Sequence, residues 1–348
     1  MKKLQSIQAL RGVAVLAVVL FHLLTVEEKY GGSKTILSSF FQFGMFGVDL
    51  FFVISGFVMI TVTRGKFQCH KEALKFIYHR VVRIYPTYWV YSILVLGVFL
   101  IKPSWVNSSQ GNQVDILASF LLLPSQTLPL VMVGWTLIHE MYFYLVFSLI
   151  LMLVPEKKIL PAILLWGVTI VCLNLFLTSN TPVVKIITHP LTLEFIGGCI
   201  LAIIYHRKDV KVKPRILLVS AFLVLLASLC IFQYYQTVTG EIEPQGWWRA
   251  LIFGIPAMLL VCFFTNAERN GYVIQLPLVK VGDASYSIYL SHILTLNVVG
   301  RVWSIFSTNE IYDNIIMIPV ILILTITAGF ISYIVVEKPL LNISRRVF

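Results

Sequence analysis

Long apolar runs separated by short polar segments are the dominant pattern of this chain. An α-helix rises about 1.5 Å per residue, so a run of roughly 20 apolar residues crosses the hydrocarbon core of a bilayer. Ten such runs occur, at about 10–26, 40–63, 84–101, 134–154, 159–177, 190–205, 216–234, 248–265, 282–299 and 315–336. The pattern predicts an all-α fold: a polytopic integral membrane protein with about ten transmembrane helices.

The basic residues set the expected orientation of these helices. With the N-terminus inside the cell, 21 of the 27 Lys and Arg fall in cytoplasmic segments. The six on the outside are Lys29, Lys34, Lys102, Lys185, Arg249 and Arg301. Because cytoplasmic loops are enriched in Lys and Arg, both termini are expected inside. The first run contains Arg11 and His22 and lacks a small-residue cleavage site, so it is expected to be a retained helix rather than a signal peptide.

Composition excludes several other classes of protein. The 348 residues are 58% hydrophobic and 12% charged, with a mean hydropathy of +0.87, which is not typical of a soluble domain. The net charge of +11 belongs to the loops between apolar runs, so nucleic-acid binding is not expected. The five cysteines have no metal-ligand spacing, and neither a disulfide nor a metal site is expected.

The chain is expected to form a single transmembrane domain over residues 1–348, with no internal repeat and no soluble domain. The longest outer loop, about 102–133, contains an apolar piece at 116–123 that is closed by Pro124. This piece is too short to span the membrane, so a re-entrant or interfacial element is expected there.

The first helix carries two residues that are unusual in a membrane. Arg11 lies where the apolar run begins, and His22 lies within it. Eleven residues of α-helix separate two side chains by about 16 Å but place them within roughly 20° of each other around the axis. Both side chains are therefore expected on one face, with the guanidinium at the membrane surface and the imidazole near mid-bilayer. The alternative is a boundary arginine with a buried structural histidine.

Titratable residues on five different predicted spans fall at a similar depth. His22, Asp49, Glu140, Glu194 and His292 are each about 15–21 Å from the cytoplasmic end of their spans. Each one alone can be a polar group satisfied by helix packing. Together they favour an acid–base site or a proton path, since ionisable groups in a bilayer are costly and mostly functional.

The residues around this layer suggest how it is built. Asp49 is expected to hold the imidazole of His22 in one tautomer, as carboxylates commonly do for histidine. Small residues near Asp49 permit close approach of helices; they are Gly44, Gly47, Ser55 and Gly56. Tyr144 lies one helical turn after Glu140. On the ninth span, the spacing of Ser285, Tyr289 and His292 puts them on one stripe.

A basic cluster is predicted at the cytoplasmic surface. Arg80 and Arg83, three residues apart, form a pair of guanidinium groups suited to phosphate. Ordinary positive-inside charge and contact with lipid headgroups are the alternatives. A ligand with phosphates at the inner surface and a reactive end near mid-membrane has the shape of an acyl-coenzyme A.

Seven short motifs follow one another along almost the whole chain. They are Arg-x10-His at Arg11 and His22, Gly-x-Asp-x-Phe-Phe-x-x-Ser-Gly at 47–56, Arg-x-x-Arg-Ile-x-Pro at 80–86, Trp-Thr-Leu-x-x-Glu-x-x-Phe-Tyr at 135–144, Glu-Phe-x-Gly at 194–197, Ser-Tyr-x-x-Tyr-Leu-x-His at 285–292 and Glu-Lys-Pro at 337–339. In this order they resemble the membrane-bound acyltransferase 3 family of bacterial sugar O-acyltransferases. The departures are Thr136, where serine is commoner, and His139 before the motif glutamate.

The resemblance implies a reaction and a location. The donor is expected to be cytoplasmic acetyl-coenzyme A or another acyl-coenzyme A, used as co-substrate with no bound cofactor. The acceptor is expected to be a hydroxyl of an extracytoplasmic or lipid-linked glycan, such as exopolysaccharide or lipopolysaccharide O-antigen. The protein would be a multi-pass protein of the bacterial inner membrane, in contact with membrane lipid.

The resemblance also implies roles for individual residues. His22 is expected to be catalytic, with Arg11, Arg80 and Arg83 on the donor side. Asp49 and Glu140 are interpreted as orienting or proton-relay groups of the catalytic site. The other motif residues expected to bind substrate or donor are Trp135, Tyr144, Glu194, Ser285, Tyr289 and His292.

Two other functions fit part of the pattern. A proton-coupled transporter, or a flippase of lipid-linked sugars, would also use mid-membrane His, Asp and Glu. The sequence shows no inverted repeat and no paired broken helices, which such carriers commonly have. A purely structural membrane subunit would not need the titratable layer.

Overall fold

The structure, a computed structural model, describes residues 4–31, 35–177, 179–207, 214–272, 276–307 and 311–344. Every regular element in these ranges is helical, which confirms the predicted all-α fold. Contacts between residues divide the chain into two compact units. The first unit is Met1–Ala14, Phe46–Tyr78 and Tyr142–Asp283, and the second is Val15–Met45, His79–Met141 and Ala284–Phe348. Three helices have residues in both units: α1 (Gln5–Tyr30), α3 (His70–Ile101) and α5 (Trp135–Leu153).

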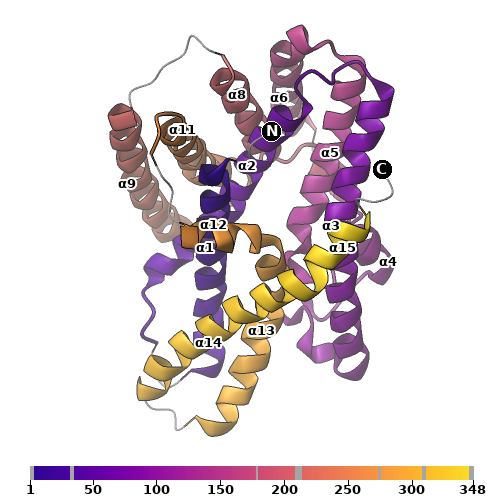
Figure 1. Cartoon of the computed structure of the whole chain (residues 1–348). Helices are drawn as coiled ribbons and strands as arrows, with labels where there is room; N and C mark the ends of the chain where they lie inside the picture. Colours follow the sequence, from indigo (N-terminus) through magenta and orange to yellow (C-terminus); the bar gives the residue numbers. More distant parts are fainter. Residues whose placement is uncertain are drawn as a thin grey trace. The chain divides into compact units, whose positions relative to one another are not determined.

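The first unit is built around α2 and α8, which lie against each other (Figure 1). Its helices are α2 (Phe46–Thr63), α6 (Ile159–Phe176), α7 (Pro182–Ile187), α8 (Thr192–Tyr205), α9 (Pro214–Thr239), α10 (Gly246–Arg249), the π-helical turn η6 (Ala250–Gly254), α11 (Ile255–Arg269) and α12 (Leu276–Asp283). A Cβ atom added at Gly56 would lie 1.9 Å from the carbonyl oxygen of Phe195, and one at Gly198 would lie 2.0 Å from that of Val53. The backbones of α2 and α8 therefore touch, and the predicted close approach at Gly56 is confirmed.

The start of α1 is held within the first unit by α11 and α12. The carboxylate of Glu268 accepts hydrogen bonds from the backbone N–H groups of Gln5 and Ser6, at 3.0 and 2.8 Å. It thereby satisfies donors that a helix N-terminus leaves free and complements the helix dipole. Close packing on α12 follows, since a Cβ atom at Gly12 would lie 2.5 Å from the carbonyl oxygen of Leu278. These contacts fix the turn of α1 that carries Arg11.

In the second unit α13 and α14 pack against the remainder of α1. Its further helices are the 3₁₀ segment η1 (Ser39–Met45), α4 (Ile116–Leu121), α13 (Ser285–Phe306), α14 (Ile311–Ser332), the π-helical turn η7 (Tyr333–Glu337) and α15 (Lys338–Ser344). A buried apolar cluster joins α1, α13 and α14 and includes Leu23, Tyr30, Leu296, Met317 and Ile321. This packing sets the face of α1 on which His22 lies.

The apolar piece of the long outer loop forms the six-residue helix α4. Asp115 caps its N-terminus by accepting the backbone N–H of Ala118 at 2.9 Å. Three aromatic residues of α3 donate to the last carbonyl groups of α4; they are Tyr85 to Leu121, Tyr88 to Ser119 and Trp89 to Phe120. The polar ends of this short helix are thus satisfied by protein rather than by water.

Nine helical segments in the described part of the chain are long and apolar enough to cross a membrane. They are Gln5–Tyr30, Ser39–Thr63, His70–Ile101, Met132–Leu153, Glu156–Phe176, Pro182–Tyr205, Arg215–Thr239, Gly246–Arg269 and Tyr312–Ile343. They correspond to nine of the ten predicted spans. The tenth, 282–299, falls on α13, which has 22 residues but also His292, Asn297 and Arg301. The inward position of both termini stays a prediction, and Lys34 lies outside the described residues.

Candidate active site

Two histidines meet in the second unit. His22 of α1 and His292 of α13 lie with their ring centroids 4.9 Å apart, and Nε2 of His292 is 3.3 Å from Nδ1 of His22. Nδ1 of His22 is also 2.9 Å from the carbonyl oxygen of Val18, one turn earlier on α1. Nδ1 of His292 is 2.6 Å from the carbonyl oxygen of Tyr289, one turn earlier on α13. Each imidazole is therefore oriented by the main chain of its own helix.

These contacts determine the tautomer of both rings. A carbonyl oxygen only accepts hydrogen bonds, so Nδ1 carries the hydrogen in His22 and in His292. The second nitrogen of each neutral ring, Nε2, then holds a lone pair. Nε2 of His292 accepts from Nδ1–H of His22, and Nε2 of His22 is left as the basic nitrogen. This is the arrangement that a general base requires.

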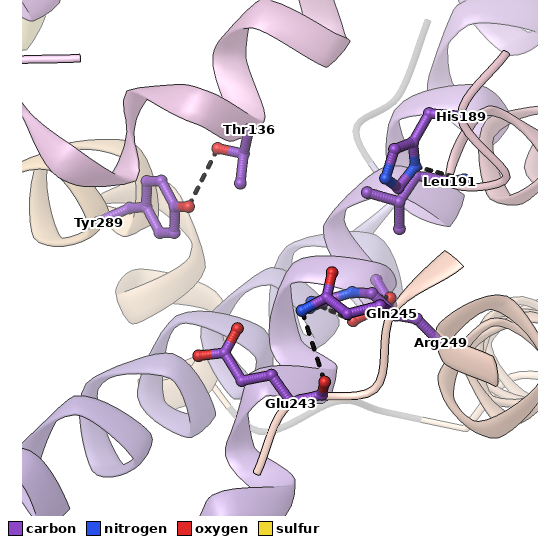
Figure 2. Close-up of polar contacts among 8 residues, drawn as sticks. Thr136, His189, Leu191, Glu243, Gln245, Arg249 and Tyr289 are labelled. Carbon is purple, nitrogen blue, oxygen red and sulfur yellow. Dashed lines mark hydrogen bonds and ion pairs between the residues drawn. The ribbon is translucent and has the colours of Figure 1, made fainter. Parts of the chain in front are cut away.

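Tyr289 extends the pair towards α5. Its hydroxyl is 3.0 Å from that of Thr136 (Figure 2). The Thr136 hydroxyl in turn donates to the carbonyl oxygen of Val133 at 2.9 Å. The threonine of the Trp-Thr-Leu motif thus fixes the ring of Tyr289, whose carbonyl group orients His292. Predicted residues of two separate motifs are connected to His22 in this way.

Helix α13 contains further buried polar groups outside the stripe of Ser285, Tyr289 and His292. The Ser287 hydroxyl donates to Oε2 of Glu337 at 2.5 Å, and the Tyr286 hydroxyl donates to the carbonyl oxygen of Ile84 at 2.7 Å. Glu337 belongs to the closing Glu-Lys-Pro motif and lies in the π-helical turn η7. Ser285 is buried, and its hydroxyl has no hydrogen-bond partner within the described ranges. The hydroxyl of Ser285, the serine predicted to bind substrate, is therefore available to form a hydrogen bond with a ligand.

In the first unit Asp49 forms a buried ion pair with Arg249. Nε and Nη2 of Arg249 each donate to one carboxylate oxygen of Asp49 at 2.9 Å, and the two side chains are 6% and 0% exposed. Such a two-pronged contact matches the planar guanidinium to the carboxylate. Asp49 thus has an arginine as its partner within the first unit, and its expected contact with the imidazole of His22 stays a prediction. Arg249, counted among the basic residues on the outer side, is buried.

Glu194 shares this buried region with Asp49 and Arg249. It is 1% exposed, it interacts electrostatically with both partners, and neither carboxylate oxygen has a hydrogen-bond partner among the residues described. A Cβ atom at Gly254 would lie 3.1 Å from Cγ of Glu194, so the glycine provides the room that this side chain occupies. One guanidinium group faces two carboxyl groups. The second carboxyl group is left to be satisfied by a proton or by the donors of a ligand.

Arg249 is held in place by the segments on either side of it. Trp247 donates its indole N–H to Oδ1 of Asn174 at 2.7 Å, and the π-helical turn η6 begins directly after the arginine. Figure 2 shows Arg249 beside Gln245, and it shows His189, whose Nδ1 accepts the backbone N–H of Leu191 at 3.2 Å. Sequence reasoning missed Arg249. The available signal was the need of the buried Asp49 for a counter-charge and an arginine in the first turn of an apolar run.

The remaining candidate residues lie on helices and are partly exposed, with one exception. Half-buried positions are occupied by Arg11 on α1, Arg80 and Arg83 on α3, and Trp135 and Glu140 on α5. Tyr144 is 2% exposed and packs edge-on against Phe76, with centroids 6.0 Å apart. Of the five residues of the predicted titratable layer, His22, Glu140 and His292 belong to the second unit, and Asp49 and Glu194 belong to the first. Among the described residues no group of three or more His, Cys, Asp and Glu is arranged to hold a metal ion.

Comparisons with known proteins agree with this set of motifs. Residues 4–334 match the model of the acyltransferase 3 family, described as an acyltransferase domain. The chain is 29% identical over 336 residues to the exopolysaccharide production protein ExoZ of Rhizobium meliloti (strain 1021), covering 94% of this chain and 96% of ExoZ. It is 27% identical over 388 residues to the acyltransferase MdmB of Streptomyces mycarofaciens, covering 99% of this chain and 93% of MdmB.

A third relative is longer than this chain. The O-acetyltransferase OatA of Staphylococcus aureus (strain NCTC 8325 / PS 47) is 24% identical over 374 residues, which cover 97% of this chain and 57% of OatA. No solved structure matches. Because the family model covers almost the whole sequence, the chain belongs to the acyltransferase 3 family.

Proposed function

We propose that this protein is a membrane-bound O-acyltransferase with His22 as its catalytic base. It moves an acyl group, with acetyl as the first candidate, from a cytoplasmic acyl-coenzyme A to a hydroxyl of a cell-surface polysaccharide or a lipid-linked sugar. The membrane would be the bacterial inner membrane. The observation that carries the proposal is the pair of contacts from Nδ1 of His22 to the Val18 carbonyl and to His292, since they leave Nε2 as the basic nitrogen.

The basic nitrogen, Nε2 of His22, begins the proposed reaction. Nε2 of His22 takes the proton of the acceptor hydroxyl while the hydroxyl oxygen attacks the thioester carbonyl carbon. The tetrahedral intermediate collapses with cleavage of the carbon–sulfur bond, and the coenzyme A sulfur receives the proton from His22. An ester and a free thiol result, and the imidazole returns to its neutral form. Proton transfer by a positioned base contributes about 10²- to 10⁴-fold to such rates.

His292 supports the protonated state of His22 in this scheme. When Nε2 gains the proton, the Nδ1–H group of His22 becomes part of a cation. Its acceptors are then the Val18 carbonyl and the lone pair on Nε2 of His292. Charge-assisted hydrogen bonds are roughly twice as strong as neutral ones. His292 is therefore proposed as a positioning residue rather than a substrate ligand.

The donor phosphates are assigned to the arginines. Arg80 and Arg83 are three positions apart on α3, so they share one face of it. Arg11 lies on α1, the helix that carries His22. Guanidinium groups bind phosphate in a two-pronged manner. Asp49, Arg249 and Glu194 are proposed to orient the acceptor or to relay protons, and Glu140 to assist them. The names of two relatives, an exopolysaccharide production protein and an O-acetyltransferase, support a glycan acceptor and an acetyl group.

The test combines analysis of the glycan with kinetics. Mass spectrometry of surface polysaccharide from cells with and without the protein should show one acetyl mass per modified repeat, absent with His22→Ala. In purified protein His22→Ala should lower kcat by about 10²-fold or more and leave donor binding intact. Arg83→Ala should instead raise the KM for the donor by about tenfold. Exposed His70, replaced by alanine, is the control.

Two results would contradict the proposal. An active His22→Ala variant would remove the catalytic assignment. Unchanged modification, with an altered amount of polysaccharide at the surface, would point to transport instead, and the buried groups would then be interpreted as a proton path.

A further inference from the structure

The first unit contains a pocket at the ends of three helices. It lies at the end of α2 and α8 and at the beginning of α6, and its volume is about 270 Å³. One part of its wall is apolar and includes Ile60, Phe67 and Ile203. The other part is polar and comprises the charged residues Arg64, Glu156, Lys157 and Arg207 together with His206. The residues proposed for acyl transfer do not line this pocket.

The polar part is predominantly cationic. Arg64, Lys157 and Arg207 form no ion pair with any residue that the structure describes. The single carboxylate, Glu156, accepts the backbone N–H of Gly65 at 2.8 Å, in the turn that follows α2. Gly65 has a φ of +72°, so this turn requires glycine. Three cations therefore face one carboxylate that is already bound to the main chain.

His206 holds Arg64 without cancelling its charge. Nη1 of Arg64 donates to Nδ1 of His206 at 3.0 Å, which makes Nδ1 the acceptor, and Nε2–H of His206 donates to the Thr61 hydroxyl at 3.2 Å. Burial, together with the charges of Arg64 and Arg269, lowers the pKa of His206, in agreement with a neutral ring. An arginine oriented by a neutral partner keeps its full charge for a ligand.

A pocket that is apolar on one side and cationic on the other favours one class of ligand. A soluble phosphate ester would need the cations but not the apolar side of the pocket. A phospholipid needs both, because its phosphate is joined through one glycerol unit to acyl chains, which lie in the apolar part of the membrane. Basic pockets between transmembrane helices are a common binding site of anionic lipid headgroups. We propose that this pocket binds the phosphate and the first acyl carbons of an anionic phospholipid of the membrane that surrounds the protein.

Native mass spectrometry of the purified full chain, titrated with phosphatidylglycerol, tests this proposal. Lys157→Gln and Arg207→Gln should each weaken the tightest binding event by about fivefold, the factor expected for one cation near a membrane surface. Lys158→Gln is the matched control, because Lys158 is the next residue, is also exposed and does not line the pocket. It should leave the affinity unchanged. Phosphatidylcholine should not compete, and neither should inorganic phosphate or coenzyme A.

Each possible result of the titration either supports or overturns the lipid site. Equal weakening by Lys157→Gln and Lys158→Gln would show general surface attraction and overturn the proposal. Displacement of the lipid by coenzyme A would assign the pocket to a soluble phosphate ester and would overturn it as well. Loss confined to the two pocket variants supports it. Acyl transfer by these variants is measured separately, so that failure of the proposed function is distinguishable from failure of the lipid site.

Discussion

A histidine acts as a base only through the nitrogen that lacks a hydrogen, and at His22 the main chain decides which nitrogen that is. The Val18 carbonyl takes the Nδ1–H group, and His292 lies beside it at 3.3 Å. The acid–base character of this site therefore depends on helix geometry as much as on the imidazole. His292 is 270 residues away in the sequence, and its depth in its span predicted that it lies in the same layer as His22, but not that the two rings touch.

The role of His292 is testable with two replacements. Glutamine keeps an acceptor for Nδ1–H of His22, whereas leucine does not. We expect His292→Leu to lower kcat by about 10- to 100-fold, the loss of one charge-assisted hydrogen bond, with the KM of the donor unchanged. His292→Gln should restore much of this loss. The pH dependence of kcat should shift in the leucine variant, and an unshifted profile would indicate that His292 is only a packing residue.

The ion pair between Asp49 and Arg249 gives a prediction about stability. Removing one member leaves a buried charge without a partner, which costs about 3–5 kcal/mol. Asp49→Asn and Arg249→Gln should each lower the thermal unfolding temperature in detergent. The double variant Asp49→Leu with Arg249→Met should lose less than either single change, because neither member of the ion pair is left alone and the remaining carboxyl group, Glu194, is neutral when it holds a proton. If that variant is as unstable as the single ones, the pair is not the stabilising contact.

The same variants separate stability from function. A double variant that is stably folded but inactive would support the proposed role of the pair in acyl transfer. A stable and active double variant would make the pair purely structural. Arg249→Lys is a useful companion, since lysine keeps the charge but loses the two-pronged contact.

Sequence reasoning identified most of these residues but not how they pair. Depth along a helix can be counted from the sequence, and it predicted one layer that contains His22, Asp49, Glu140, Glu194 and His292. Which side chains touch depends on the rotation and packing of each helix, which the count does not contain. The pairing of Asp49 with Arg249 was therefore not predicted. Arg249 was counted among the basic residues on the outer side, although it is the second residue of the predicted run 248–265.

Among the helices, α2 and α8 show most directly how sequence sets packing. Both contribute a glycine at their crossing, and a Cβ atom on either would lie within 2.0 Å of a carbonyl oxygen of the other helix. The contact carries Asp49 on α2 and Glu194 on α8. Small residues at the crossing were recognisable from the sequence for α2. Their partner on α8 was not, because glycine in a membrane helix is common.

The close contact at this crossing predicts that a glycine replacement there is costly, whereas the same replacement at an open position of another helix is not. Gly198→Ala should force the helices apart and cost about 1–3 kcal/mol, seen as a lower thermal unfolding temperature. Gly97→Ala on α3 is the control, because no atom other than the backbone of its own helix and its chain neighbours lies within 4 Å of the added Cβ. Alanine there should be neutral or slightly stabilising, by up to about 1 kcal/mol. A tolerated Gly198→Ala change would mean that α2 and α8 can separate without loss.

The two π-helical turns are a second feature of the elements. One, η6, begins directly after Arg249, and the other, η7, ends at Glu337. Both adjoin a buried charged residue with a hydrogen-bonded partner, Asp49 in one case and Ser287 in the other. Extra residues of this kind in a helix are often found at functional sites, since they turn a side chain to a different face. Apolar periodicity in the sequence does not reveal such turns.

At the scale of the whole molecule, the open issue is how the chain crosses the membrane. Among the ten predicted spans, the one on α13 is not apolar enough to count among the nine membrane-crossing segments. The same helix carries Ser285, Tyr289 and His292. Polar residues for chemistry lower the hydropathy of a span, so the segment nearest the proposed active site is the hardest to recognise as transmembrane. The N-in, C-in orientation requires α13 to cross, since ten spans return the chain to the side on which it began.

Cysteine labelling distinguishes the two arrangements. In a background with the five native cysteines replaced by alanine, single cysteines are placed at Asn270 before α13 and at Ser304 near its end, both exposed positions. If α13 crosses in the predicted direction, a membrane-impermeant maleimide added to spheroplasts labels Ser304→Cys at once, and Asn270→Cys only after permeabilisation. Ser108→Cys and Lys71→Cys, on either side of the span in α3, are the outer and inner references.

Labelling of Asn270→Cys and Ser304→Cys on the same side would leave nine crossings and would move the C-terminus outside. A reversed pattern at all four positions would place Arg80 and Arg83 away from cytoplasmic acyl-coenzyme A and remove the proposed donor side.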